Sequence, residues 1–386
     1  MRAWTFVLIT LVMVAGGGVQ AAEAPFARGL PRQDTFFPLA VWLQAPSNAA
    51  RYKAIGINLY VGLWRGPTGE QLDALDESGI RLICGQDERS LRFRDRPTIV
   101  GWMHGDEPDN AQSLGQGKGY GPPIPASTII EGYHKIRKAD PERPVLLNLG
   151  QGVAWDGYYG RGARTNHPED YRQYLKGCDL ASFDVYPASH TNKEVAGNLW
   201  YVPRGVDRLR RWSDGRKDVW CCIETTGIDN EKRRPTPRQV REEVWMALIH
   251  GAKGIIYFAH QFKPKFIEAG LLADDEMARE VAAVNCQVRE LAPVLNGPDV
   301  ASGAVVVSSE RRVPVDFVVK RRSDKTYLFS AAMRAGDTTA SFKLPNQEDA
   351  QVEVIGEGRT IEAPGGEWED RFTGYQVHLY RIARGR

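Results

Sequence analysis

Eight short apolar segments, spaced along the first three quarters of the chain, constrain its fold more than any other feature of the sequence. Each segment is almost uninterrupted by polar residues and then ends in them, a pattern typical of parallel strands buried on both faces. The predicted strands are Pro38–Gln44, Asn58–Trp64, Arg81–Asp87, Ile99–Glu107, Pro144–Gly150, Leu180–Pro187, Val219–Thr226 and Gly254–His260. The sequence therefore predicts an α/β fold built on a parallel sheet.

Helical periodicity separates most of these strands. Helices are predicted over Gly69–Ser78, Ser127–Ala139, Thr236–His250 and Glu276–Leu291, whereas Glu88–Thr98 is too short for a full helix. Eight strands with intervening helices match a (β/α)8 TIM barrel, which occupies about 250 residues. A doubly wound sheet is the alternative, but no glycine-rich phosphate loop follows the first strand.

The pattern changes after the last predicted helix. Residues 298–386 contain short alternating runs separated by turns such as Pro364-Gly365-Gly366, with no helical periodicity. These features predict a C-terminal antiparallel β-sandwich. The predicted organisation is a signal peptide at 1–21, a catalytic barrel at 22–297 and a β-sandwich domain at 298–386.

The N-terminus is typical of a secretory signal. Arg2 precedes an apolar run from Trp4 to Ala15, and small residues lead to Ala21. A membrane anchor is the alternative, although the run is short for a span of about 20 residues. We expect cleavage after Ala21 and a secreted or periplasmic protein with no membrane span, since no second long apolar run follows.

The charge balance argues against a nucleic-acid partner. Among 386 residues, 50 Lys and Arg stand against 48 Asp and Glu, which gives a net charge of +2. Nucleic-acid binding normally requires a basic surface region, and no broad excess of basic residues is present.

Two glutamates at the ends of predicted strands are the first candidates for catalysis. Glu107 ends the fourth strand and Glu224 lies near the end of the seventh. Barrel enzymes carry their catalytic groups at the carboxyl ends of the strands, so these two side chains are expected to share one end of the barrel.

The sequence around these strand ends resembles the clan-A glycoside hydrolases. The stretch from Gly101 to Pro108 (GWMHGDEP) carries the strongest match, and Asp184-Val185-Tyr186-Pro187 is similar as well. The resemblance implies a (β/α)8 barrel with Glu107 as the acid/base and Glu224 as the nucleophile. The clan usually has Asn before the acid/base glutamate, where this chain has Asp106.

The implied reaction is retaining hydrolysis of a glycosidic bond. One carboxyl group protonates the leaving oxygen and another attacks the anomeric carbon, and the two lie about 5–5.5 Å apart. The expected partner is an oligosaccharide or polysaccharide substrate, and no cofactor is expected.

Other residues near the strand ends are candidates for sugar contacts, because aromatic rings cover the apolar faces of sugars while amides and carboxylates bind the hydroxyls. The predicted substrate-binding residues are Trp42, Trp64, Gln86, His104, Asp106, Asn148, Trp155, Asp184, Tyr186, Tyr257 and His260. Arg161 and Arg164, in the loop after the fifth strand, are either ligands for an anionic sugar or part of a solvated loop surface.

Two other functions remain open from the sequence. A non-catalytic carbohydrate-binding barrel would keep the aromatic residues but would not need both glutamates. A metal-dependent hydrolase would need a ligand set such as His104, Asp106 and His260, whose spacing is generic. The five Cys residues likewise show no zinc-binding spacing.

Overall fold

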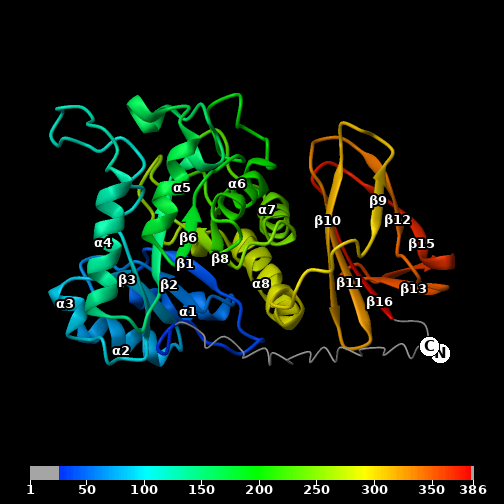
Figure 1. Ribbon diagram of the computed structural model, residues 1–386, viewed down its shortest axis with the longest axis horizontal. Coiled ribbons are helices and arrows are strands. Elements are labelled where there is room, and N and C mark those ends of the chain that lie inside the picture. The colour runs from blue at the N-terminus through cyan, green and yellow to red at the C-terminus, as the bar shows by residue number, and fades with distance from the viewer. Residues whose placement is uncertain (1–25, 384–386) are drawn as a thin grey trace, which may run out of the picture.

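The computed structural model describes residues 26–383 and contains two domains, a barrel and a β-domain (Figure 1). The predicted signal peptide at 1–21 lies outside the described residues. Within the described part, no helix is long and apolar enough to cross a membrane.

The first domain is a closed barrel of eight parallel strands, each hydrogen-bonded to the next in chain order. Its strands are β1 (Leu39–Trp42), β2 (Leu59–Val61), β3 (Arg81–Gly85), β4 (Ile99–Met103), β5 (Val145–Leu149), β6 (Leu180–Phe183), β7 (Asp218–Glu224) and β8 (Gly254–Phe258). The predicted TIM barrel is therefore confirmed. All eight strands end before the predicted ones do, so several polar residues assigned to strand ends, Glu107 among them, lie in the loops beyond.

Helices surround the barrel. They are α1 (Ala49–Ala54), α2 (Gly69–Glu77), α3 (Glu88–Leu91), α4 (Ala126–Ala139), α5 (Tyr171–Tyr174), α6 (Tyr201–Trp212), α7 (Pro237–Ile249) and α8 (Asp275–Leu295). Side-chain capping begins α2 at Thr68 and α7 at Thr236, because each hydroxyl accepts an otherwise unpaired backbone N–H. The four predicted helices are confirmed, and Glu88–Thr98 supplies only the single turn of α3.

Short 3-10 turns replace regular helix elsewhere. They are η1 (Pro46–Asn48), η2 (Gln151–Val153), η3 (Tyr159–Arg164), η4 (Pro168–Asp170), η5 (Leu175–Gly177), η6 (Leu271–Ala273) and η7 (Pro364–Gly366). Four of these turns lie between β5 and β6, so this connection forms an irregular layer over the barrel instead of one long helix.

Alternation along the strands divides the barrel core into two parts. Trp220, Cys222 and Ile256 belong to the cluster inside the barrel, whereas Cys221 and Ile255 pack with the surrounding helices. Because successive side chains of a strand point to opposite faces, this parity also decides which strand-end residues can reach the mouth.

The second domain contains two antiparallel sheets with a shared core. One sheet has the order β10-β11-β16-β13-β14 and the other β15-β12-β9. The strands are β9 (Val305–Ser308), β10 (Val315–Arg322), β11 (Lys325–Ala332), β12 (Thr338–Lys343), β13 (Ala350–Val354), β14 (Arg359–Ala363), β15 (Glu367–Phe372) and β16 (Val377–Ala383). Leu328, Phe342, Trp368 and Tyr380 lie in this core, which confirms the predicted sandwich.

The β-domain packs on the helical layer of the barrel, where α7 meets β10, β11 and β16 (Figure 1). Trp245 of α7 is fully buried, and its ring centroid lies 5.4 Å from that of Phe329 in β11. His250, directly after α7, lies between Asp207 of α6 at 2.9 Å and Asp316 of β10 at 3.3 Å. Polar and apolar contacts thus join the two domains.

The environment of His250 predicts a pH-dependent contribution to stability. Burial lowers its pKa, but the hydrogen bond to Asp207 and the nearby carboxylate of Asp316 outweigh this and raise it to about 9. A raised pKa stabilises the folded state below the unfolded value of about 6.5, and this contribution disappears as pH rises through the folded value.

We expect His250→Gln to lower the free energy of unfolding by at least about 1 kcal/mol near pH 6, with the difference from the wild type vanishing well above pH 9. Thermal unfolding of the full chain across this range measures the effect. His167→Gln is the matched control, because the His167 side chain pairs with the exposed Glu169 in a loop away from the domain contact. A constant difference at every pH would contradict the assignment.

Candidate active site

Glu107 lies four residues beyond the end of β4, in a strained backbone conformation. Its φ of +43° falls in the left-handed region, which favours glycine and is costly for a residue with a long side chain. Backbone hydrogen bonds hold it there: Glu107 N donates to Asn148 O at 3.2 Å, and Asn110 N donates to Glu107 O at 3.1 Å. Strain of this kind concentrates at functional sites.

The carboxyl group of Glu107 is hydrogen-bonded to that of Asp184, which follows β6. Burial raises the pKa of Glu107 far above its usual range, and the negative charges of Asp184, Asp106 and Asp109 raise it further. The pKa of Asp184 is also raised, mainly by burial, but to a smaller extent. The shared proton therefore stays on Glu107, which donates it to the Asp184 carboxylate.

Asp106 is held at the mouth of the barrel by a chain of polar contacts. Asn148 Nδ2 donates to Asp106 Oδ1 at 2.9 Å, and Asn148 Oδ1 accepts from Ser182 Oγ at 2.7 Å. Asn148 lies inside the barrel and is only 4% exposed. The predicted residues Asp106, Asn148 and Asp184 thus come together around Glu107.

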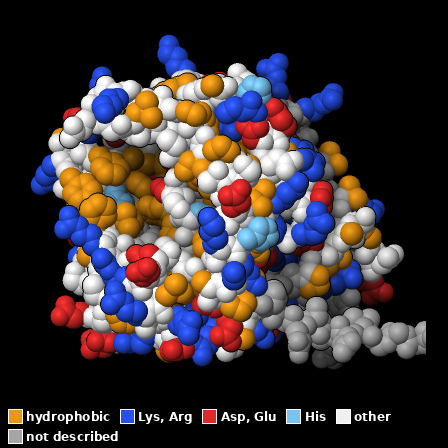
Figure 2. Space-filling model, turned by 60° about the vertical axis from the view of Figure 1, so that its left-hand side comes forward, with side chains coloured by type: hydrophobic (Ala, Val, Ile, Leu, Met, Phe, Trp, Pro, Cys, Tyr) orange, Lys and Arg blue, Asp and Glu red, His pale blue; other side chains and the backbone are white. Residues whose placement is uncertain are grey.

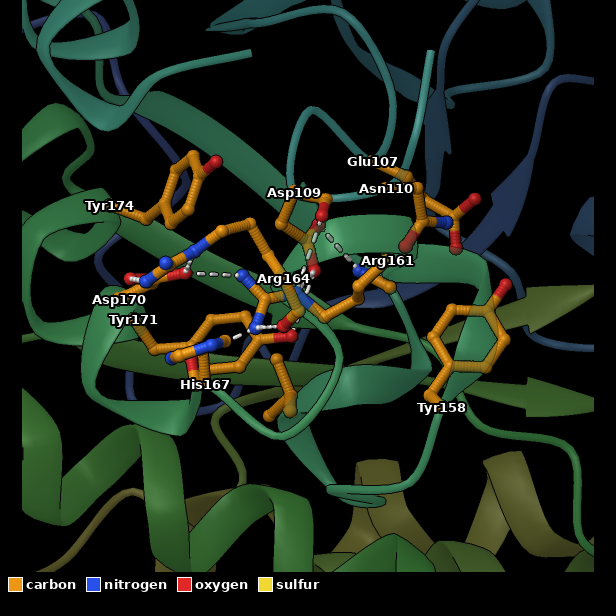
Figure 3. Close-up of polar contacts among 12 residues, drawn as sticks. Glu107, Asp109, Asn110, Tyr158, Arg161, Arg164, His167, Asp170, Tyr171 and Tyr174 are labelled. Atoms are coloured by element: carbon orange, nitrogen blue, oxygen red, sulfur yellow. Dashed lines mark hydrogen bonds and ion pairs between the residues drawn. The ribbon is translucent and has the colours of Figure 1, made fainter. Parts of the chain in front are cut away.

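A buried network behind Glu107 fixes the loop that carries it (Figure 3). The Asp109 carboxylate accepts from Gly150 N at 2.9 Å and from the Tyr171 hydroxyl at 2.9 Å. Arg161 is 2% exposed, and its guanidinium donates to Asp170 Oδ2 at 2.9 Å.

Arg161 fits neither of the two expectations from the sequence, whereas Arg164 lies on the partly solvated loop surface. Both are paired with Asp170, and Arg161 is buried instead of solvated. The sequence does not indicate this pairing, because Asp170 belongs to η4 and the two arginines to the preceding turn η3. Because both guanidinium groups pair with Asp170, they stabilise the loop and are not available to bind an anionic sugar.

Glu224 is the last residue of β7 and is completely shielded from solvent. Its Oε1 accepts from Ala188 N at 2.6 Å and its Oε2 from Ser189 N at 2.8 Å. Burial raises the pKa of Glu224, and the hydrogen bonds from Ser189 and Ala188 oppose that rise. Glu224 lies at the predicted strand end, but its carboxylate is held by the loop after β6.

A cavity of about 690 Å³ opens at the side of the mouth formed by β1, β2 and β8, and we call it the aromatic cavity. Its lining residues are Trp42, Leu43, Gln44, Ala45, Pro46, Trp64, Gln71, Asp106, Phe258, His260, Phe262, Phe266 and Glu268. Figure 2 shows a deep hollow with a mainly hydrophobic lining on the barrel. The predicted residues Trp42, Trp64, Asp106 and His260 all line the aromatic cavity.

A second, smaller cavity of about 300 Å³ lies over the loops after β5, β6 and β7, and we call it the tyrosine cavity. Its lining residues are Gln151, Tyr158, Tyr159, Tyr186, Ser189, His190, Thr191, Ile228, Asp229 and Phe262. Phe262 belongs to both cavities, so the two are neighbours. The predicted residue Trp155 is buried beneath this rim, with its ring 5.5 Å from His190 and 5.9 Å from Tyr158.

Glu107 is not among the residues that line either cavity, but residues near it line both. Its neighbour Asp106 lines the aromatic cavity. Tyr158 and Tyr186 line the tyrosine cavity, and the charge of Glu107 contributes to the raised pKa of each. Glu107 is therefore close to residues of both cavities.

Three residues predicted to contact substrate point into the helical layer instead. Gln86 Nε2 donates to Ile136 O at 3.2 Å, His104 Nε2 is 2.8 Å from Gly177 O, and Tyr257 donates to Asn285 Oδ1 at 2.7 Å. Tyr257 follows the inward-facing Ile256, so strand parity directs it outward. Since His104 faces away from the mouth, it cannot combine with Asp106 and His260 as a metal site.

Within residues 26–383, no group of three or more His, Cys, Asp or Glu side chains is arranged to hold a metal ion. The five Cys residues are free, and all but Cys286 are buried.

Several cavity residues escaped the sequence analysis. Phe262 and Phe266 lie in the loop beyond β8 and stack with centroids 5.8 Å apart, while Phe258 ends β8. The sequence signal for Phe258 is strand parity, because it stands two residues after the inward-facing Ile256. No local pattern indicates Phe262 and Phe266, because their placement depends on how the loop folds back over the mouth.

Comparison with known proteins finds one family model that matches part of the barrel. Residues 126–291 match the Glyco_hydro_42 model, described as beta-galactosidase. No curated protein matches the chain in sequence.

Solved structures share the fold at low sequence identity. A catalytic mutant of Gan42B, a GH42 β-galactosidase from G. stearothermophilus, has a TM-score of 0.59 and 10% identity, covering 91% of this chain and 99% of that one. A putative α-galactosidase from Bacteroides fragilis has a TM-score of 0.55 and 10% identity, covering 91% and 80%. The maltogenic α-amylase AmyB from Thermotoga neapolitana has a TM-score of 0.55 and 7% identity, covering 92% and 100%.

Proposed function

We propose that this chain is a retaining (β/α)8 glycoside hydrolase of clan A that acts on O-glycosyl bonds, with Glu107 as its acid/base and Glu224 as its nucleophile. The single observation that carries the proposal is the contrast between the two carboxyl environments. Burial, together with neighbouring negative charges, raises the pKa of Glu107 to about 11, whereas hydrogen bonds from Ala188 N and Ser189 N limit the burial-driven rise at Glu224 to a pKa of about 7. Glu107 therefore keeps its proton at neutral pH, and Glu224 ionises more readily, as an acid and a nucleophile require.

The reaction proceeds by double displacement. Glu224 attacks the anomeric carbon while Glu107 gives its proton to the leaving oxygen, so that a glycosyl ester forms on Glu224 and an alcohol leaves. Glu107, now ionised, then takes a proton from water, which attacks the ester and restores Glu224. The anomeric configuration is retained because each displacement inverts it once.

Asp184 is a positioning residue for Glu107 in this proposal. Retaining catalysis places its two carboxyl groups about 5–5.5 Å apart, with the anomeric carbon between them. Glu107 and Asp184 are instead in direct hydrogen-bond contact, which leaves no room for a sugar. Asp184 therefore keeps the proton on Glu107 and does not act as the nucleophile.

The proposed substrate is an oligosaccharide or polysaccharide with a β or equatorial linkage. Exposed aromatic rings can pack against the apolar faces of pyranose units. Asp106, Gln44 and Glu268 in the aromatic cavity can form hydrogen bonds with the sugar hydroxyls. The match to a β-galactosidase model makes β-galactosides the first substrates to test.

Export is part of the proposal and rests on the sequence of the first 21 residues alone. A basic residue, an apolar run and small residues before Ala22 are typical of a cleaved signal. N-terminal sequencing of the protein from its native host is expected to begin near Ala22. An intact Met1 on a membrane-embedded protein would favour the anchor instead.

A hydrolysis screen tests the proposed function directly. Purified protein is incubated with aryl β-glycosides and with β-linked oligosaccharides and polysaccharides, and the first product anomer is followed by NMR. A β-anomer from a β-glycoside is expected. Saturable glycan binding without turnover of any substrate would favour a non-catalytic barrel, and an inverted product would contradict double displacement.

Phe262 offers a test of the two-cavity arrangement. Its ring is 48% exposed and borders both cavities. We expect Phe262→Ala to raise KM for oligosaccharides by about three- to tenfold, the size of one lost aromatic contact, with little change in kcat. Aryl monoglycosides, which fill fewer subsites, should be affected less.

Tyr120→Ala is the matched control, because Tyr120 is 76% exposed and lines neither cavity. An equal KM for oligosaccharides in Phe262→Ala and the wild type would contradict binding across Phe262.

A further inference from the structure

A buried glutamate on α7 has no role in the reaction as described so far. Glu243 is fully buried, and neither of its carboxyl oxygens receives a hydrogen bond from an N–H or O–H donor within the described residues. It lies between Val240 and Val244, which are also fully buried. A buried carboxylate without donors is very unfavourable, so the neutral acid is the stable form.

The carboxyl group of Glu243 lies beside that of Glu224, close enough for a hydrogen bond between them once one of the two is protonated. One of the two carboxyl groups must supply the proton for this bond. Glu224 already accepts from Ala188 N and Ser189 N, which stabilise its anion, whereas Glu243 has no donor. The proton therefore belongs to Glu243, and the negative charge of the pair lies on Glu224.

Other titratable groups around Glu243 do not change this assignment. Glu242, its neighbour on α7, accepts from Arg238 Nε at 2.7 Å, and its charge further disfavours ionisation of Glu243. Cys221, on β7, is a fully buried thiol whose own pKa is raised by burial and by Glu243. Within the described residues, the charges that act on Glu243 are those of Glu224 and Glu242, and both are negative.

We propose that Glu243 is a positioning residue whose protonated carboxyl group orients Glu224 and keeps it anionic. The inference rests on the proposed function and deepens it. Four donors then fix the Glu224 carboxylate: the backbone N–H groups of Ala188 and Ser189, the Ser189 hydroxyl and the carboxyl group of Glu243. Glu243 stays protonated throughout, and no proton or electron pair is transferred to or from it.

The pH profile of kcat/KM separates this role from simple packing. Glu243→Gln keeps a weaker donor, and Glu243→Leu removes the donor. Loss of a donor to a carboxylate raises its pKa, so the acidic limb of the profile is expected to move to higher pH, by less than about one unit for Gln and by about one unit or more for Leu. Glu242→Gln, with the same substitution one residue away, should leave the limb in place.

A limb that stays in place in both Glu243 variants would overturn the proposal. If the Glu243→Leu protein does not fold, the Glu243→Gln variant decides the question. Its acidic limb moves to higher pH if the proposal holds and stays in place if it does not.

Infrared spectroscopy tests the protonation of Glu243 without relying on turnover. The difference spectrum between the wild type and Glu243→Gln at neutral pH is expected to contain the C=O band of one protonated carboxyl group. Absence of this band would overturn the inference while leaving the glycosidase assignment intact. Wild-type protein with the band but without hydrolysis of any glycoside would instead reject the proposed function.

Discussion

The Glu224→Ala variant is expected to lose turnover of every glycoside by at least about a thousandfold, as happens when a covalent nucleophile is removed. Without this carboxylate no glycosyl ester can form, so activated aryl glycosides should be affected as strongly as natural glycans. Steady-state kinetics on both classes of substrate measures the loss. Addition of azide should restore some activity and yield a product of inverted configuration, since the small anion replaces the missing carboxylate.

Glu231→Ala is the matched control for Glu224→Ala, because Glu231 is an exposed carboxylate in the loop after β7. It should retain wild-type kinetics. Equal residual activity in the Glu224 and Glu231 variants would exclude Glu224 as the nucleophile and would show that its two backbone hydrogen bonds only hold the loop after β6.

The Glu107→Ala variant is expected to discriminate between leaving groups. General acid catalysis contributes about 10²- to 10⁴-fold, so substrates with poor leaving groups should slow by about this amount. An activated aryl leaving group departs without protonation, so the glycosyl ester still forms but breaks down slowly. A burst of aryl product followed by a slow steady state is the expected time course.

The pH profile provides a second measurement on Glu107. The high pKa of Glu107 keeps the acid protonated through neutral pH, and activity on poor leaving groups should fall only when it ionises at alkaline pH. This alkaline limb should be missing in Glu107→Ala. Azide should rescue the variant with retained configuration, because the anion attacks the ester without a base.

Glu131→Ala, on the exposed side of α4, is the control for Glu107→Ala. Equal losses on aryl and natural substrates, with no azide rescue, would contradict an acid/base role for Glu107.

Much of the fold could be predicted from the sequence because the barrel strands are buried on both faces. That burial produces continuous apolar runs such as Val219–Ile223, which are visible without knowledge of their neighbours. The strand ends were harder to place, because a polar residue after an apolar run can pair in the sheet or begin a loop. Glu107 is such a case, since the strand ends at Met103 and a strained turn carries the glutamate.

The site was predictable only where strand position decides the direction of a side chain. Trp42 and Asn148 lie inside the barrel or its mouth, whereas parity sends Tyr257 outward. The pairing of Arg161 with Asp170 and the contact between Glu224 and Glu243 depend on loop and helix packing across the chain. Glu243 did leave a signal, a charged residue on the apolar stripe of α7, but the pattern does not reveal its partner.

Helix α7 contacts both the β-domain and the proposed nucleophile. One side of this helix packs on β11 through Trp245 and Phe329, and another carries Glu243 to Glu224. A shortened chain ending near residue 297 would expose Trp245 and release the helix that carries Glu243 to Glu224, the proposed nucleophile. We therefore expect the barrel to need the C-terminal domain. A foreign domain that replaced it would have to pack on α7 as closely as β11 does.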